Sequence, residues 1–174
     1  MNRKSIIIFT DGAARGNPGP GGFGAIIIIG DKVTELGGRE AHTTNNRMEL
    51  MGAIAALEYL SGKEVKDITL YADSTYVVLG MTEWAARWQR NGWKTANKKR
   101  VENQDLWERL LSAADGKKIQ WKRIDGHKGV AGNERCDEIA TAFADLSTSS
   151  RQAAPKLYSG VLKNYRIRNI LNVS

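Results

Sequence analysis

The sequence predicts an α/β fold in which helices flank a five-stranded mixed sheet, antiparallel in one half and parallel in the other. Three observations support this prediction. Two apolar runs, residues 6–9 and 68–72, each lead into an aspartate. Between them, residues 23–29 and 33–38 form two further strand-like runs beside glycine-containing turns, as in an antiparallel meander. Apolar residues at helical spacing then separate the later strands.

The first run, Ile6–Phe9, is apolar and mostly β-branched, which indicates a strand buried on both faces. Asp11 follows, although aspartate is a poor strand former and is costly to bury without a partner. Its place before a turn rich in glycine and proline, residues 16–22, suggests that the core opens into a site there. Taken alone, the pattern is equally typical of a hairpin whose aspartate caps a turn.

A helix is predicted after residues 43–46, whose side chains can cap it. Apolar residues recur at helical spacing as far as Leu60, and Gly62 is a suitable end. Glu49 lies in the first turn of this helix. A glutamate at that position either belongs to a site or simply complements the helix dipole.

Residues 68–72 repeat the opening pattern, because an apolar strand leads into Asp73 and a capping serine follows. If this strand and the first are parallel neighbours, Asp11 and Asp73 lie together at their carboxyl ends. Open α/β sheets place their sites at such ends.

Residues 82–101 contain three tryptophans among clustered basic side chains. Trp84 and Trp88 are i,i+4 neighbours on one helix face, which is also compatible with a place in the core. However, residues 84–104 hold six basic residues against one acidic residue, a net charge of +5. We therefore expect a projecting helix and loop that grip a phosphate backbone, followed by an amphipathic helix over residues 103–114.

The last predicted strand covers residues 119–124, and glycines flank His127 in the loop after it. A helix is expected over residues 130–146. It contains Asp137, which from its position alone is most simply a solvated helix acid. Cys136 is most simply a small buried side chain.

The composition limits the broad class of protein. A chain of 174 residues suffices for one domain with a sizeable core. Its single cysteine excludes an internal disulfide and fits a reducing cytosol. No apolar run approaches the roughly 20 residues of a membrane span, and the N-terminus lacks an apolar signal region. We expect a cytoplasmic monomer without membrane contact.

The charge is concentrated at two places. Residues 147–174 begin as a linker and then combine apolar with basic side chains, for a net charge of +5. Together with residues 84–104 they exceed the net charge of +7 of the whole chain, so the remainder is mildly acidic. This distribution favours a polyanionic partner held beside a carboxylate site.

Four separated motifs closely resemble those of bacterial type 1 ribonuclease H, in the same order and over about residues 4–146. They are Thr10-Asp11-Gly12 with the turn at residues 16–22, residues 44–50, Asp73-Ser74, and Gly126-His127 with residues 133–137. The resemblance implies a ribonuclease H-like fold and a catalytic domain over residues 1–146, with residues 82–101 as its basic protrusion. Residues 147–174 match no motif of the family and form a C-terminal extension.

The resemblance implies an endoribonuclease that hydrolyses the RNA strand of RNA–DNA hybrids and leaves 5′-phosphate and 3′-hydroxyl ends. Two Mg²⁺ ions would serve as cofactors, with Mn²⁺ as a substitute, because hard divalent cations prefer oxygen ligands. The acids that would bind them and act in catalysis are Asp11, Glu49, Asp73 and Asp137. Asp11 would bridge the ions, Asp137 would hold one, and the other two acids would hold the ion beside the nucleophile.

The resemblance also makes His127 catalytic, as an aid to proton transfer or product departure, although a structural loop histidine is the alternative. By the resemblance, the RNA 2′-hydroxyl groups would be recognised by amide side chains, which both donate and accept hydrogen bonds. These side chains are Asn17, Asn45 and Asn46.

Contacts with the DNA strand are implied for Trp84 and Trp88 in the protrusion and for Thr44 and Asn103 in a phosphate pocket. Two departures from the family bear on recognition. His42 stands where relatives usually have an arginine in that pocket, which removes a permanent bidentate donor. Thr75 replaces a common glutamine and puts one minor-groove contact in doubt.

Two other classes of function compete with this hypothesis. A hybrid-binding module without catalysis is disfavoured by acids at all four matching positions. A related nuclease such as a DNA-junction resolvase has no need of the three asparagines or of the tryptophan-rich protrusion. For the extension we favour docking on the domain; the alternatives are a larger hybrid-binding surface or contact with a partner protein.

Overall fold

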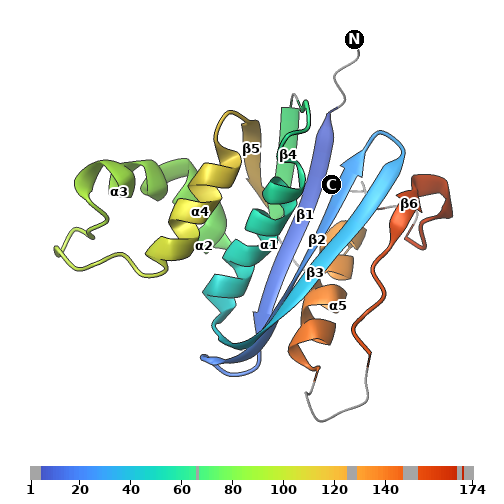
Figure 1. Cartoon of the computed structure of the whole chain (residues 1–174), viewed down its shortest axis with the longest axis horizontal. Coiled ribbons are helices and arrows are strands. Elements are labelled where there is room, and N and C mark those ends of the chain that lie inside the picture. The colour runs from blue at the N-terminus through green and yellow to red at the C-terminus, as the bar shows by residue number, and fades with distance from the viewer. Residues whose placement is uncertain (1–4, 66, 125–128, 147–152, 168–169, 171–174) are drawn as a thin grey trace.

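The structure, a computed structural model, describes residues 5–65, 67–124, 129–146, 153–167 and 170. Within these residues a six-stranded sheet forms the centre of the molecule, in the order β5-β4-β1-β2-β3-β6 (Figure 1). The strands are β1 (Ile6–Ala14), β2 (Gly19–Ile29), β3 (Lys32–Thr43), β4 (Asp67–Ala72), β5 (Lys118–Arg123) and β6 (Ser159–Val161).

The sheet is mixed, as predicted. Strand β1 pairs antiparallel with β2 and parallel with β4, while β2–β3 is antiparallel and β4–β5 is parallel. The prediction of five strands was wrong by one, because β6 from the C-terminal extension pairs antiparallel with β3. An edge strand exposes unpaired N–H and C=O groups, and β6 covers part of that edge. Strand β3 extends well beyond the predicted run of residues 33–38, and its pairing with β6 means that it does not form the edge of the sheet there.

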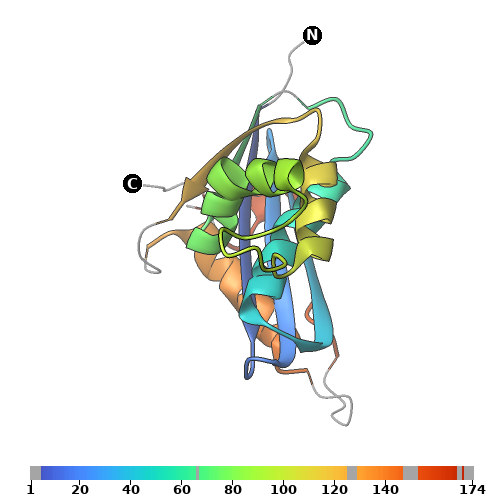
Figure 2. The ribbon, with the colours of Figure 1, turned by 90° about the vertical axis from the view of Figure 1, so that its left-hand side faces the viewer.

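Helices cover both faces of the sheet. They are α1 (Asn45–Tyr59), α2 (Thr75–Leu79), the π-helical turn η1 (Gly80–Trp84), α3 (Ala85–Asn91), α4 (Gln104–Ala114), α5 (Ala131–Ala144) and the 3₁₀ turn η2 (Leu162–Asn164). Helices α1 and α4 lie on one face and α5 on the other (Figures 1 and 2). Helix α3 and the loop after it project away from the sheet, beyond α4 and α2, at the left of Figure 1. No helix in the described ranges has the length and apolar character needed to cross a bilayer.

The two faces of the central strands bury different cores, because successive strand residues point to opposite sides. Ile6 and Ile8 of β1 pack into the cluster that includes the inner side of α1, such as Leu57. Phe9 packs on the other face with Cys136 of α5. Burial on both faces explains why the run Ile6–Phe9 is continuously apolar.

Candidate active site

Two of the predicted acids meet at the carboxyl ends of adjacent strands. Thr10 of β1 pairs with Ala72 of β4 in parallel register, so Asp11 and Asp73 come next to each other. Asp11 is only 5% exposed, whereas Asp73 is half-buried. The predicted parallel arrangement of these strands is confirmed.

Glu49 reaches the same place because α1 lies close against β1. A Cβ atom on Gly12 would be 2.3 Å from the carbonyl carbon of Met48 and 2.4 Å from the backbone nitrogen of Glu49. Only glycine permits this approach. The helix begins beside it, where the Thr44 hydroxyl accepts the Arg47 backbone N–H at 3.2 Å and caps α1.

The three acids form a compact oxygen cluster. One carboxylate oxygen from each of Asp11, Glu49 and Asp73 lies within 4.8 Å of the other two. Burial and the negative charge of Asp73 raise the pKa of Asp11 to about 8. The Gly12 N–H, which donates to Asp11 Oδ1 at 2.8 Å, acts in the opposite direction but only partly offsets this rise. Burial, Asp11 and Asp73 raise the pKa of Glu49 well above its ordinary value. The carboxylates therefore repel one another in the absence of a compensating positive charge.

The donor set fits a hard divalent cation. All ligands in the cluster are carboxylate oxygens, which such ions prefer. Glu49 Oε2 is buried and finds no hydrogen-bond partner in the part of the chain that the structure describes. A buried oxygen of this kind is costly unless something positive contacts it.

The other two predicted catalytic residues differ in position. Asp137 is exposed on α5 and is not part of the three-acid cluster. Burial and the charge of Asp73 are the main causes of the raised pKa of Asp11, and the negative charge of Asp137 adds to them, so Asp137 lies close enough to act on that carboxyl group. His127 lies outside the described residues.

The asparagines assigned to RNA all lie exposed near the cluster's end of the sheet. Asn17 is in the turn between β1 and β2, and Asn45 and Asn46 begin α1. The Asn45 side-chain oxygen accepts the Ala14 N–H at 2.7 Å and so links the start of α1 to the end of β1. The glycine-rich turn and the helix start are thus held together.

Thr44 and Asn103 are linked through Arg47. The Arg47 guanidinium donates to Asn103 Oδ1 at 3.2 Å and forms an ion pair with Asp105 at 2.7 Å. The Asn103 amide in turn donates to the Tyr76 hydroxyl at 3.2 Å. Sequence reasoning missed Arg47 and its partner, because the pair is 58 residues apart and nothing local signals it.

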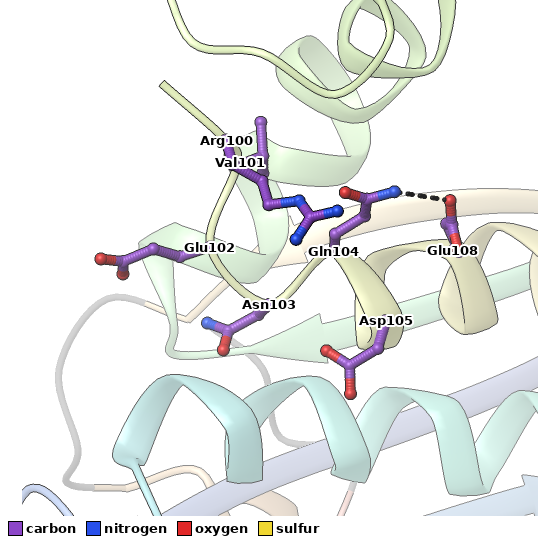
Figure 3. A pocket seen from close by; sticks show the side chains of 7 residues that line it. All are labelled: Arg100, Val101, Glu102, Asn103, Gln104, Asp105 and Glu108. Carbon is purple, nitrogen blue, oxygen red and sulfur yellow. Dashed lines mark hydrogen bonds between the residues drawn. The ribbon is translucent and has the colours of Figure 1, made fainter.

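Asn103 lines an open cavity of about 550 Å³ at the start of α4. In Figure 3 its side chain and that of Asp105 lie on the side of this cavity nearer α1. Of the two departures from the family, His42 is exposed on β3 and Thr75 is exposed at the first position of α2.

The tryptophans attach the protrusion to the body. Trp84 and Trp88 are half-buried with ring centroids 5.8 Å apart, and Trp88 packs edge-on against the fully buried Trp107 of α4 at 5.6 Å. Each ring therefore packs against other aromatic rings while part of its surface remains exposed to solvent. The basic residues of the protrusion are exposed, as expected: Arg87, Arg90, Lys94, Lys98, Lys99 and Arg100.

Comparison with known proteins gives consistent matches. The family model described as RNase H matches residues 3–145. Ribonuclease H of Cyanothece sp. is 53% identical over 145 residues, which are 83% of this chain and 92% of that protein. Ribonuclease H of Alcanivorax borkumensis is 54% identical over 142 residues, 82% of this chain and 93% of the relative.

Solved structures show the same fold. The crystal structure of LC9-RNase H1, a type 1 RNase H with the type 2 active-site motif, matches with a TM-score of 0.73 at 30% identity, over 86% of this chain and 76% of that one. LC11-RNase H1, solved in complex with an RNA/DNA hybrid, matches with a TM-score of 0.61 at 27% identity. That match covers 80% of this chain and 96% of the other.

Proposed function

The chain belongs to the ribonuclease H family, in its bacterial type 1 class, and from that premise we propose that it hydrolyses the RNA strand of RNA–DNA hybrids. The products would have 5′-phosphate and 3′-hydroxyl ends. The observation that supports this most directly is that Asp11 of β1, Glu49 of α1 and Asp73, which follows β4, each place a carboxylate oxygen within 4.8 Å of the other two.

The carboxylates would hold two Mg²⁺ ions, for which Mn²⁺ can substitute. Asp11, Glu49 and Asp73 provide the cluster, and Asp137 of α5 would complete it from the opposite face of the sheet. Divalent cations bound there would supply Lewis-acid stabilisation of the charge that develops on the phosphodiester. The protein's part is to keep the oxygens close together, which the Gly12 contact with α1 and the Gly12 N–H bond to Asp11 accomplish.

Selectivity for the hybrid would come from two surfaces on either side of the acids. The exposed amides of Asn17, Asn45 and Asn46 would contact the RNA 2′-hydroxyls across the minor groove. On the other side, Asn103 and the protrusion would hold the DNA strand by its phosphates. His127 is proposed, from the family resemblance, to assist proton transfer or product departure.

The test uses end-labelled RNA–DNA hybrid, duplex RNA and duplex DNA, each with Mg²⁺ or with EDTA. We expect cutting of the hybrid RNA alone, only with the metal, and product ends that a phosphatase makes resistant to ligation. The variant Glu49→Gln removes one charge from the cluster at constant shape and should lower the rate at least about 100-fold.

The matched control is Glu58→Gln, on the same helix. Glu58 is not part of the acidic cluster and instead forms an ion pair of 2.6 Å with Arg109. This variant should cleave like the parent. Hybrid binding without cleavage by the parent protein would instead support a binding module. Cleavage of duplex DNA, or full activity of Glu49→Gln, would overturn the proposal.

A further inference from the structure

The C-terminal extension, which begins beyond the family match at residue 145, is built into the domain through β3. Besides the β6–β3 pairing, the Glu35 N–H donates to the Tyr158 carbonyl at 2.7 Å. Tyr165 and Ile170 are 4% and 0% exposed and pack in the core cluster that includes Cys136 of α5. The extension thus contacts the layer of the protein to which Asp137 belongs.

A buried carboxylate joins the extension to α5. Glu35 of β3 is 3% exposed and accepts four hydrogen bonds. Arg135 of α5 donates to both of its oxygens, at 2.6 and 3.0 Å. The Tyr158 N–H donates to Oε1 at 2.9 Å and the Tyr165 hydroxyl to Oε2 at 2.5 Å. Half of the bonds therefore come from α5 and half from the extension.

Such an arrangement is cooperative. A buried ion pair is favourable only when its geometry is good and the remaining lone pairs are satisfied. If the Tyr165 hydroxyl is removed, Glu35 Oε2 retains a single donor, on Arg135. The constraint on the position of Arg135 is then weaker, although the protein keeps its hydrophobic core.

The residues on either side of Asp137 in α5 are bonded to other parts of the structure, including the extension. Arg135 also donates to Glu138 Oε2 at 2.9 Å, and Arg166 of the extension comes within 4.0 Å of the same oxygen. The Cys136 thiol donates to the carbonyl of Phe9 at 3.2 Å, and Phe9 lies in β1 two residues before Asp11. Asp137 itself is exposed, so its place depends on these neighbours.

We propose that the C-terminal extension positions the active site: Tyr165, acting through Glu35 and Arg135, holds α5 where the Asp137 carboxylate works with the three-acid cluster. Tyr165, Glu35 and Arg135 are positioning residues and contact no substrate. This inference rests on the proposed function, because it uses Asp137 as a cation-holding residue.

The test compares Tyr165→Phe with the parent and with Tyr59→Phe in the full chain. Tyr59 is a fair control because its hydroxyl shares a hydrogen bond of 3.4 Å with Thr34, the neighbour of Glu35 on β3. Three quantities are measured well below the melting temperature. They are amide hydrogen exchange in α5 without metal, the Mg²⁺ concentration for half-maximal hybrid cleavage, and kcat and KM for the hybrid.

For Tyr165→Phe we expect faster exchange in α5, a 3- to 10-fold higher half-saturating Mg²⁺ concentration and a lower kcat at subsaturating metal, with KM unchanged. Tyr59→Phe should match the parent. If Tyr165→Phe lowers only the melting temperature, with exchange in α5 and the Mg²⁺ dependence as in the parent, the extension is a structural cover and the inference is overturned. A parent protein that does not cleave hybrids would refute the proposed function instead, and the exchange in α5 would still report whether Tyr165 holds that helix.

Discussion

Neutralising Asp11 should make the metal-free protein more stable while it abolishes hydrolysis. Asp11 is buried among acids, and its raised pKa of about 8 means that the folded state binds a proton there more tightly than the unfolded state. Stability attributable to this group is complete below the unfolded pKa, near 3.8, and is lost as the pH rises through about 8. Asparagine removes the titration and keeps an oxygen that can accept the Gly12 N–H.

The size of the effect follows from the pH interval. The interval from the ordinary pKa of 3.8 to pH 7 is about 3 pH units, and each unit corresponds to about 1.4 kcal/mol. The stability that the parent loses at pH 7 through Asp11 is therefore at most about 4 kcal/mol. The added amide N–H₂ is imperfectly accommodated, so we expect Asp11→Asn to gain about 2–4 kcal/mol. For a chain of this length the gain corresponds to a melting temperature about 5–15 °C higher.

The assay is denaturant unfolding of parent and Asp11→Asn in EDTA between pH 3 and pH 9. The difference should vanish near pH 3, grow through neutral pH and level off above pH 8. Asp105→Asn is the control of opposite sign, because the hydrogen bond from Arg47 lowers the pKa of Asp105 and the variant loses that interaction. If Asp11→Asn is no more stable than the parent at pH 7, or if its advantage does not depend on pH, then the ionised Asp11 carboxylate does not destabilise the metal-free protein.

Two further predictions concern packing. A Cβ atom at Gly80 would lie 1.9 Å from Cη2 of the fully buried Trp107. Gly80→Ala should therefore destabilise the protein by about 1–3 kcal/mol in thermal or denaturant unfolding. An unchanged unfolding midpoint would contradict the close packing of η1 on α4. Burial raises the pKa of the Cys136 thiol well above its ordinary value. An aromatic disulfide reagent at pH 8 should therefore label Cys136 only after guanidinium is added. Rapid labelling of the native protein would show instead that α5 opens readily.

Local patterns along the chain were enough for the strands and helices near the acids. The continuous apolar character of residues 6–9, the repeat of the strand-to-aspartate pattern at Asp73 and the capping residues before α1 all depend on neighbours a few positions away. The resulting expectation that the two aspartate-bearing strands are parallel neighbours is confirmed by the pairing of Thr10 with Ala72. By contrast, β6 has only three residues and a weak local signal, so its pairing with β3 could not be predicted.

The burial of Glu35 likewise could not be predicted from its neighbours in the sequence. In the sequence it is a polar residue in a short strand, with nothing to distinguish it from a solvated acid. It is buried because Tyr158 and Tyr165, more than 120 residues away, cover it and Arg135 neutralises it. Arg47 and Asp105 likewise become partners only when α1 and α4 pack together.

Residue patterns alone were enough to place the strands and helices that carry Asp11, Glu49 and Asp73, and to identify the family that the chain resembles, but not β6 or the full length of β3. Long-range packing set how close the acids come, because Gly12 lacks a Cβ atom, and it joined the extension to the sheet through β6 and to α5 through Glu35. Propensity, capping and periodicity act over a few neighbouring residues and can therefore be inferred from local sequence. Carboxylate repulsion, burial and shared hydrogen bonds depend on contacts between segments that are distant in the chain.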